Sequence, residues 1–474
     1  MHRIHHPTKN ILPSRSSVIG NRRSTARPVE VEAMAEVQAA AQEMFDFVRE
    51  LFPVCRSLTG DGVRQTLHAI RRHLPELSIH EISSGTRVFD WTVPDEWNIR
   101  SARLLGPHGE TIADFTESNL HVVGYSEPID TTLTLDELQG HLYSIPELPD
   151  AVPYVTSYYK RNWGFCLTDR VRRDLLDGTY RVIIDSTLAP GHLTYGELLI
   201  KGELRDEIFL STYICHPSMA NNELSGPAVT TWLVRWLTTR PRRYSYRVVF
   251  IPETIGSLTY MSTNVETMKA NIVAGFNLTC VGDDRGFSYM PSRLGGTLAD
   301  RAAQHVLGHL APDYRRYTFL QRGSDERQYC APGIDLPVCS IMRSKYGEYP
   351  EYHTSLDNLD LVTPQGLGGA YEAYRRVIEC LEANETLTAT TLGEPQLGKR
   401  GLYPTTSTRG SGLRVRDMMN LLAYSDGEHD LLKVADVVGV PMWELLETVE
   451  TLKQHGLLVA TPQPSQMRKE VVGE

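Results

Sequence analysis

The chain has 474 residues, a length that predicts about three domains. Hydrophobic residues make up 41% and charged residues 22% of it, as in an ordinary globular protein. The formal net charge of −10 argues against a general polyanion-binding protein, because phosphate contacts need a basic surface. No run approaches the roughly 18 apolar residues of a membrane span, so we expect no membrane partner.

Seven cysteines are scattered along the chain without a CxxC pair. This odd number disfavours a disulfide framework or a thiolate zinc knuckle and indicates a reducing compartment, so we expect a cytoplasmic protein. The first thirty residues are basic, rich in Ser and His, and without an apolar core segment. Residues 1–30 are therefore predicted to be a disordered leader and not a secretory signal. The alternative is that this segment is an artefact of a start site assigned too far upstream.

The N-terminal part of the chain predicts two helices followed by a β module. Helical periodicity begins near Val31 in an Ala-rich amphipathic stretch, and a second helix is predicted from Val63 to about Leu74. Short β-branched runs then alternate with turn residues. We interpret residues 87–180 as a mainly antiparallel β domain.

The middle of the chain predicts an α/β domain. From about Glu207 to about Asn384, apolar strands alternate with helical segments, which is typical of βαβ units and a largely parallel sheet. Residues 31–86 and 181–390 would then form one α/β domain, a mixed or parallel sheet flanked by helices. The β domain is expected to be an insertion between its two parts.

The C-terminal unit, residues 405–465, follows a linker rich in Gly, Pro, Thr and Ser. Its order of helix, short helix, turn with Gly439, longer helix and short strand is that of a winged helix. The predicted recognition helix carries three glutamates against one lysine and one histidine, and phosphate contacts need the opposite charge. We expect packing within the chain or against a protein, including a homo-oligomer formed through the winged helix, more than nucleic-acid binding.

Three predicted strands end in residues that can act at a metal site. One strand runs into His216, another into Glu253, and a third is followed by a loop that contains His353. Ligands in open α/β sheets bind at the carboxyl ends of strands, so these side chains are expected to converge on one rim. Neutral imidazoles suit zinc, and a catalytic zinc site keeps a position open for water. Glu253 would take a proton from that water and pass it to a leaving amine.

Three segments together resemble the co-catalytic zinc aminopeptidase and glutamate carboxypeptidase clan: HPSMANNELSG from 216, PETIG from 252 and YHTSLDNLD from 352. More closely, the chain resembles bacterial aminopeptidase-like proteins with an inserted β domain and a C-terminal winged helix, over about 31–461. The resemblance implies a zinc-dependent hydrolase of the aminopeptidase type. In it, His216 and His353 would be metal ligands and Glu253 the general base.

The chain departs from the pattern of that clan at three acidic positions. By the resemblance, Asn222 stands for the bridging aspartate, Thr254 for the second glutamate and Thr279 for another aspartate. Two dications need bridging negative charge to offset their repulsion, so one zinc is favoured over two. The third ligand stays open among Asn222, through its amide oxygen, Glu223 and Glu253.

The segment RGSDERQY supplies candidate substrate-binding residues. Asp325 or Glu326 would hold the free α-amino group of a substrate, and Arg322 or Arg327 would bind a carboxylate by a bidentate contact. A salt-bridged surface loop is the alternative. Tyr352 in the YHT segment is a further candidate for substrate binding.

Two other patterns carry less information. The aromatic and basic stretch Tyr158–Trp163 either leans over the active site as a specificity wall or packs between domains. His305 and His309 are four residues apart on a predicted helix, but Val306 stands where zincins need glutamate, so no zinc site is expected there.

Two functions are consistent with these residues. The first is hydrolysis of an amide next to a free amino group in a small aminoacyl or peptide-like conjugate of a biosynthetic pathway, because the inserted domain should exclude long peptides. The second is a catalytically degenerate, peptidase-like regulator whose winged helix contacts DNA or a partner protein. The missing acidic ligands favour the second function, whereas the retained His216, Glu253 and His353 favour the first.

Overall fold

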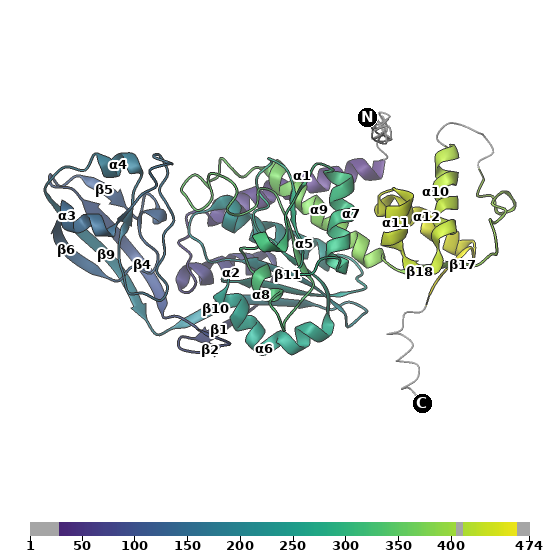
Figure 1. The fold of residues 1–474 in the computed structure, drawn as a ribbon, viewed down its shortest axis with the longest axis horizontal. Helices are drawn as coiled ribbons and strands as arrows, with labels where there is room; N and C mark the ends of the chain where they lie inside the picture. The colour runs from purple at the N-terminus through teal and green to yellow at the C-terminus, as the bar shows by residue number, and fades with distance from the viewer. Residues whose placement is uncertain (1–27, 404–410, 462–474) are drawn as a thin grey trace, which may run out of the picture.

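The computed structural model describes residues 28–403 and 411–461. The predicted leader lies outside the described residues except at its end, because α1 (Pro28–Leu51) begins within residues 1–30. Three units follow one another along the longest axis of the molecule (Figure 1). An antiparallel β unit forms one end, the α/β domain lies in the middle, and the winged helix forms the other end.

An eight-stranded sheet forms the centre of the α/β domain, in the order β1-β10-β12-β11-β13-β16-β14-β15. Its strands are β1 (Ser78–Ser83), β10 (His192–Ile200), β11 (Glu207–Tyr213), β12 (Ser245–Ile251), β13 (Ile272–Asn277), β14 (Ser288–Met290), β15 (Arg315–Arg316) and β16 (Val338–Met342). The four inner strands β12, β11, β13 and β16 are parallel, whereas β10 and β14 run antiparallel to their neighbours β12 and β16. The sheet is therefore mixed, and its parallel centre aligns several strand ends on one edge.

Helices cover both faces of this sheet. All residues of β11 are buried; Ile208 and Leu210 belong to one hydrophobic cluster and Phe209 between them to another, as expected for a central strand covered on both sides. The first cluster joins one face to α1, α2, α5, α7 and α9, and the second joins the other face to α6 and α8. The further helices are α2 (Asp61–His73), α5 (Ser225–Thr238), α6 (Ile255–Asn271), α7 (Leu298–Leu310), α8 (Glu326–Tyr329) and α9 (Pro364–Ala383).

The inserted unit is built on a four-stranded antiparallel sheet, in the order β5-β4-β9-β6. Its strands are β4 (Glu96–Leu105), β5 (Thr111–Asp114), β6 (Ile129–Thr134) and β9 (Thr179–Ala189). Shorter elements nearby are β2 (Arg87–Val88), β3 (Trp91–Thr92), α3 (Leu135–Leu138), β7 (Leu142–Tyr143), β8 (Phe165–Cys166) and α4 (Asp169–Arg173). The sequence prediction placed the end of this unit at residue 180, but β9 pairs with β4 as far as Ala189, so the sheet extends further.

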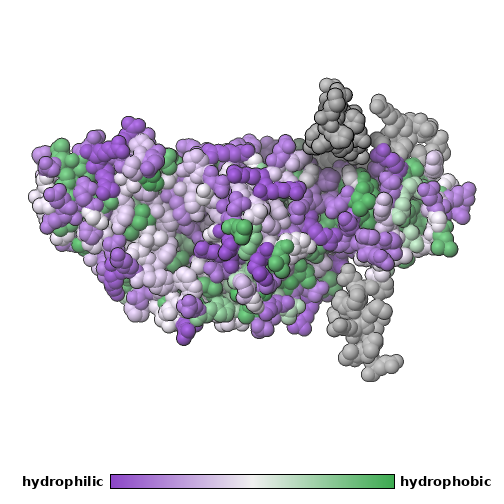
Figure 2. Space-filling view, in the orientation of Figure 1, coloured by the Kyte–Doolittle hydropathy of each residue, from purple (hydrophilic) through white to green (hydrophobic). Residues whose placement is uncertain are grey.

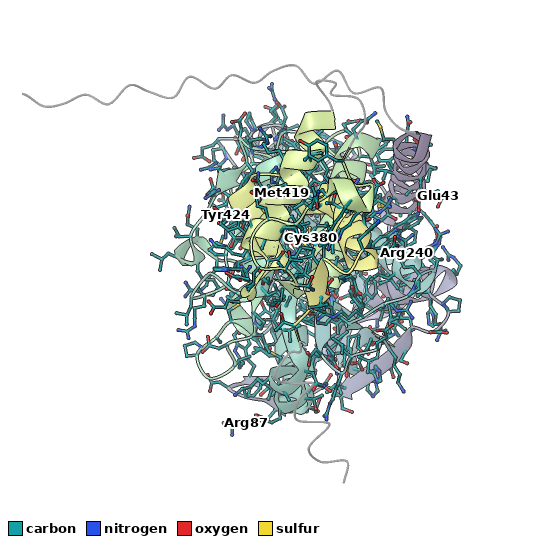
Figure 3. The ribbon with its side chains drawn as sticks, turned by 90° about the vertical axis from the view of Figure 1, so that its right-hand side faces the viewer. Glu43, Arg87, Arg240, Cys380, Met419 and Tyr424 are labelled. Carbon is teal, nitrogen blue, oxygen red and sulfur yellow. The ribbon has the colours of Figure 1, made fainter. Side chains whose placement is uncertain are left out.

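The C-terminal unit has the winged-helix order, with a three-stranded sheet β18-β17-β19. Its elements are β17 (Thr386–Ala389), α10 (Ser411–Tyr424), β18 (Asp426–Asp430), α11 (Leu431–Val438), α12 (Met442–Gln454) and β19 (Leu458–Ala460). Gly439 adopts φ 73°, the left-handed conformation that ends α11 and lets α12 start in a new direction. Figure 3 views the molecule from this end, with the winged helix in front of α9, which carries Cys380.

Polar residues cover most of the face shown in Figure 2, and hydrophobic residues gather there only in small groups. Within residues 28–403 and 411–461, no helix combines the length and the apolar character that crossing a membrane requires.

Candidate active site

His216, Glu253 and His353 meet at the carboxyl edge of the central sheet. They follow β11, β12 and β16 respectively. The ring centroids of His216 and His353 are 5.2 Å apart, and Oε2 of Glu253 lies 3.8 Å from Nε2 of His216. Two imidazoles that share one tetrahedral zinc have centroids roughly 5 Å apart, because each Zn–N bond is about 2.0–2.1 Å long. The separation of the two rings therefore fits a common ion.

Two of the predicted ligand residues have buried polar atoms without a hydrogen-bond partner. These atoms are Nε2 of His353 and both side-chain amide atoms of Asn222. Buried polar atoms normally have partners, so each such atom needs an explanation. Asn222 lies in a π-helical turn, Ala220–Leu224, a conformation that is frequent at functional sites. A bound cation would satisfy the imidazole nitrogen of His353, and imidazole is a ligand type that suits zinc.

The Nδ1 side of His216 is filled by protein groups. Oε2 of Glu223 lies 2.9 Å from this nitrogen, and Sγ of Cys215 lies 3.5 Å from it. In the part of the chain that the structure describes, Cys215, His216 and Glu223 form a compact group of potential metal-binding atoms. Nε of Arg56 lies 3.4 Å from the other carboxylate oxygen of Glu223. Nε2 of His216 remains on the side of Glu253.

Two hydrogen bonds hold Glu253 beside His216. Its backbone N–H donates to Sγ of Cys215 over 3.2 Å, and Oε1 of its side chain accepts from the Ser324 hydroxyl over 2.8 Å. Burial, and after it the nearby Asp325 carboxylate, raises the pKa of Glu253 to about 8. A carboxyl group with a pKa near neutrality suits general acid–base work.

Asp325 and Arg327 both reach the turn that follows β12. Oδ1 of Asp325 accepts from the backbone N–H of Thr254 over 2.7 Å and from the Ser257 hydroxyl over 2.9 Å. Its other oxygen, Oδ2, is buried without a partner, and burial raises the pKa of this carboxyl to about 7. Arg327 is exposed and donates to the Thr254 hydroxyl over 2.6 Å. The buried Oδ2 of Asp325 thus lacks the hydrogen bond that such an atom normally has.

The two alternatives within the same segment have other partners. Glu326 accepts from the Tyr346 hydroxyl over 2.5 Å and from the Gly323 N–H over 2.9 Å, which stabilises the loop. Arg322 is exposed and lies over the ring of Phe319. Among these four side chains, the hydrogen bonds to the turn that carries Glu253 thus come from Asp325 and Arg327.

Aromatic rings cover the two histidines. Tyr352 stacks on His353 with ring centroids 3.9 Å apart. Tyr154, which belongs to the inserted unit, lies 5.4 Å from His216 and 5.2 Å from His353, measured between ring centroids. Its hydroxyl lies 2.9 Å from that of Tyr158. Tyr154 lies just before the aromatic and basic stretch that begins at Tyr158, and its surroundings in the sequence give no signal for a place beside the histidines.

A short backbone pairing joins the inserted unit to the loop of His353. The N–H of Tyr154 donates to the carbonyl of His353 over 2.9 Å, and the N–H of Ser355 donates to that of Val152 over 2.9 Å. His353 has φ 56°, a conformation uncommon for residues other than glycine. Such strained positions persist where the surroundings hold them and are frequent at functional sites. The inserted unit therefore helps to hold His353 in place.

Comparisons with known proteins give the family. A family model described as "Domain of unknown function (DUF4910)" matches residues 45–384, and a winged helix-turn-helix model matches residues 385–460. The chain belongs to the DUF4910 family. A curated relative from Clostridium acetobutylicum is 47% identical over 419 residues, which cover 88% of this chain and 96% of the relative. It is described as a "Putative polysaccharide biosynthesis protein with aminopeptidase-like domain".

Solved structures place this DUF4910 chain in the zinc aminopeptidase fold. The crystal structure of a "putative peptidase" from Clostridium acetobutylicum is similar with a TM-score of 0.86 and 44% identity, covering 91% of this chain and 99% of that one. BSAP, a zinc aminopeptidase from Bacillus subtilis, is similar with a TM-score of 0.52 and 14% identity, covering 72% and 94%. At that identity the likeness concerns the fold alone. The predicted resemblance, the α/β class and the winged helix are confirmed.

Proposed function

We propose that this protein is a zinc-dependent hydrolase of the aminopeptidase type, which cleaves an amide bond next to a free amino group. The observation that carries the proposal is the meeting of His216 and His353, with ring centroids 5.2 Å apart at the edge of the sheet. The partnerless Nε2 of His353 supports it, because a bound cation would satisfy this atom.

One zinc ion would be held by Nε2 of His216, Nε2 of His353 and the amide oxygen of Asn222. Zinc at such a site supplies Lewis-acid activation of water and of the scissile carbonyl. A single ion is favoured because Asn222, Thr254 and Thr279 are neutral where two dications would need bridging negative charge.

Glu253 is the proposed proton carrier of the reaction. Its Oε1 is engaged by Ser324, which leaves Oε2 on the side of His216 to accept a proton from the attacking water. The same carboxyl then donates this proton to the leaving amine. Burial, and after it the neighbouring Asp325 carboxylate, raises the pKa of Glu253, which favours the step in which this carboxyl donates a proton to the leaving amine.

The substrate is proposed to be a small conjugate with a free amino group. The unpartnered Oδ2 of Asp325 offers an acceptor for that ammonium group, and Arg327 and Tyr352 lie at the rim as further substrate contacts. The cover formed by Tyr154 supports a small substrate because it narrows the space beside both histidines. The description of the curated relative points to polysaccharide biosynthesis as the pathway.

A reducing compartment, and hence the cytoplasm, fits the seven cysteines, all of them unpaired. For the winged helix we propose a role in packing within the chain or between copies of it, and no role in nucleic-acid binding. The first turn of α12, with which such units read bases, lies against α7.

Elemental analysis coupled to an aminoacyl-anilide screen tests the proposal. We expect about one zinc per chain in the wild type, loss of zinc in His216→Ala and His353→Ala, and retained zinc without turnover in Glu253→Gln. Glu266→Gln, on the exposed side of α6, is the matched control and should keep both zinc and turnover.

Two results would contradict the proposed function. A folded wild-type protein that takes up no zinc would support the catalytically degenerate regulator instead. Loss of zinc in Glu253→Gln would show that Glu253 is a ligand and not the general base.

A further inference from the structure

We propose that Glu223 and Arg56 form a positioning pair that orients His216 and determines which of its ring nitrogens carries the proton. In this assignment Glu223 is not a metal ligand, although the sequence leaves it among the candidates. The use of the oriented His216 as a ligand rests on the proposed function, whereas the pair itself rests on geometry within the protein.

The contact between Glu223 and His216 defines the form of the imidazole. Oε2 of Glu223 lies 2.9 Å from Nδ1 of His216, and both side chains are buried. The guanidinium of Arg56 beside Glu223 favours the ionised carboxylate, which only accepts hydrogen bonds. We therefore assign the proton of this contact to Nδ1 of His216. The lone pair is then on Nε2, which faces Glu253. A carboxylate on the far nitrogen is the usual way in which proteins orient a metal-binding histidine.

Arg56 contacts both the carboxylate of Glu223 and the backbone of His216. Its Nε lies 3.4 Å from Oε1 of Glu223 and donates to the backbone carbonyl of His216 over 2.8 Å. Its Nη1 donates to the carbonyl of Leu51 at the end of α1 over 2.9 Å. The side chains of Arg56 and Glu223 are both fully buried, so each charge needs the other. One guanidinium thus anchors the carboxylate and the backbone of the histidine that it orients.

The position of Arg56 also argues against a metal ion on the Nδ1 side. Cys215, His216 and Glu223 are close enough to bind one ion there. An ion bound among them would sit next to the guanidinium that contacts the same carboxylate, and like charges repel strongly in a buried site. The pair therefore directs a cation to Nε2. It also gives a role to the segment CRSLTGDG from 55, which the proposed function does not otherwise use.

The first test uses the metal-free wild-type protein with ¹⁵N-labelled histidine. We expect His216, assigned through its absence in His216→Asn, to show a proton on Nδ1 and none on Nε2. A proton on Nε2 would overturn the proposal. This readout involves neither zinc nor turnover, so it decides the pair even if the protein proves to be no hydrolase.

The second test compares two buried Arg–Glu pairs by chelator competition. Removing a carboxylate that orients a metal ligand typically weakens metal affinity about 10- to 100-fold, and we expect this for Glu223→Gln with zinc still at one per chain. Glu207→Gln breaks the pair with Arg247 at the opposite end of β11 and should leave zinc affinity within about twofold. Glu223→Asp applies the same test if the neutral variant does not fold. Unchanged affinity, or a complete loss of zinc like that of His216→Ala, would overturn the assignment.

Discussion

The backbone N–H of Met442 donates to Nε2 of His305 over 2.9 Å, which attaches the first turn of α12 to α7. Nδ1 of the same ring lies 2.6 Å from a carboxylate oxygen of Asp436 in α11. Trp443 packs against the rings of His305 and His309, and the guanidinium of Arg376 lies over it. The start of the recognition helix is therefore bound to the α/β domain of its own chain.

This docking predicts that the intact protein does not bind DNA. Helix-turn-helix proteins read bases with the first residues of the recognition helix, and here Met442 is buried. Fluorescence anisotropy with a mixed-sequence duplex at low salt should show no saturable binding. Tight binding that weakens steeply with salt would contradict the prediction, because that dependence is the mark of phosphate contacts.

Replacing His305 should loosen the winged helix. His305→Ala removes the acceptor of the Met442 N–H and leaves that group buried, which typically costs about 1–3 kcal/mol. Hydrogen exchange should become faster in α11 and α12 and stay unchanged in the inserted unit. His309→Ala is the matched control, since the ring of His309 also packs against Trp443 but does not accept the backbone N–H of Met442. Equal effects of the two variants would show that this hydrogen bond is not what holds the unit.

Asn222→Leu should have opposite effects in the absence and presence of zinc. Without zinc, the change removes two buried amide atoms that lack partners, so the thermal midpoint should stay the same or rise. With zinc, the loss of an oxygen ligand should lower the affinity about tenfold or more. Calorimetry with and without the metal measures both effects. An unchanged zinc affinity would exclude Asn222 from the ligands.

Tyr154 should influence the metal site from the inserted unit. Tyr154→Phe removes the hydroxyl contact with Tyr158 and should cost about 1 kcal/mol of stability without affecting zinc. Tyr154→Ala removes the ring that lies against both histidines, and zinc affinity should fall about tenfold. Tyr159→Ala changes an exposed neighbour and serves as the control. If Tyr154→Ala left the affinity unchanged, the cover would have no part in holding the ligands.

The contact between the winged helix and α7 should weaken in acid. Burial alone would raise the pKa of Asp430, but hydrogen bonds from Arg301 and Asn384 outweigh it and hold this pKa below the ordinary 3.8. An acid with a lowered pKa stabilises the fold above its unfolded pKa, and this contribution is lost as the pH falls through the folded value. The thermal midpoint of the wild type should thus drop more than that of Asp430→Asn below about pH 4. Parallel pH profiles would contradict this.

Much of the fold could be predicted because its elements are strongly periodic. The apolar strands before His216 and Glu253 and the helical C-terminal order have patterns that local sequence carries well. The direction of the strands could not be predicted as well, since nothing in the local sequence of β10 or β14 marks these strands as antiparallel. The predicted end of the inserted unit, residue 180, was wrong for a similar reason, because the sequence of β9 does not show which sheet this strand joins.

Residues of the candidate site could be predicted from the sequence only where they follow a strand. His216, Glu253 and His353 do so, and the structure brings them to one edge. The place of Glu223 depends on a π-helical turn, which helical periodicity does not anticipate and which turns successive side chains differently from an α-helix. Tyr154 depends on a pairing between segments about two hundred residues apart, and such contacts leave no local trace.

The pairing of 152–154 with 353–355 means that the inserted unit is not a removable accessory. Deleting the unit would remove the cover of His216 and His353. It would also release the loop of His353, whose strained backbone conformation persists only where the surroundings hold it. The arrangement of His216 and His353 could not be kept by trimming this chain to its α/β part. Any homologue that lost the insertion would need a new lining for the same histidines, so we expect the insertion and the late histidine loop to be gained, altered or lost together.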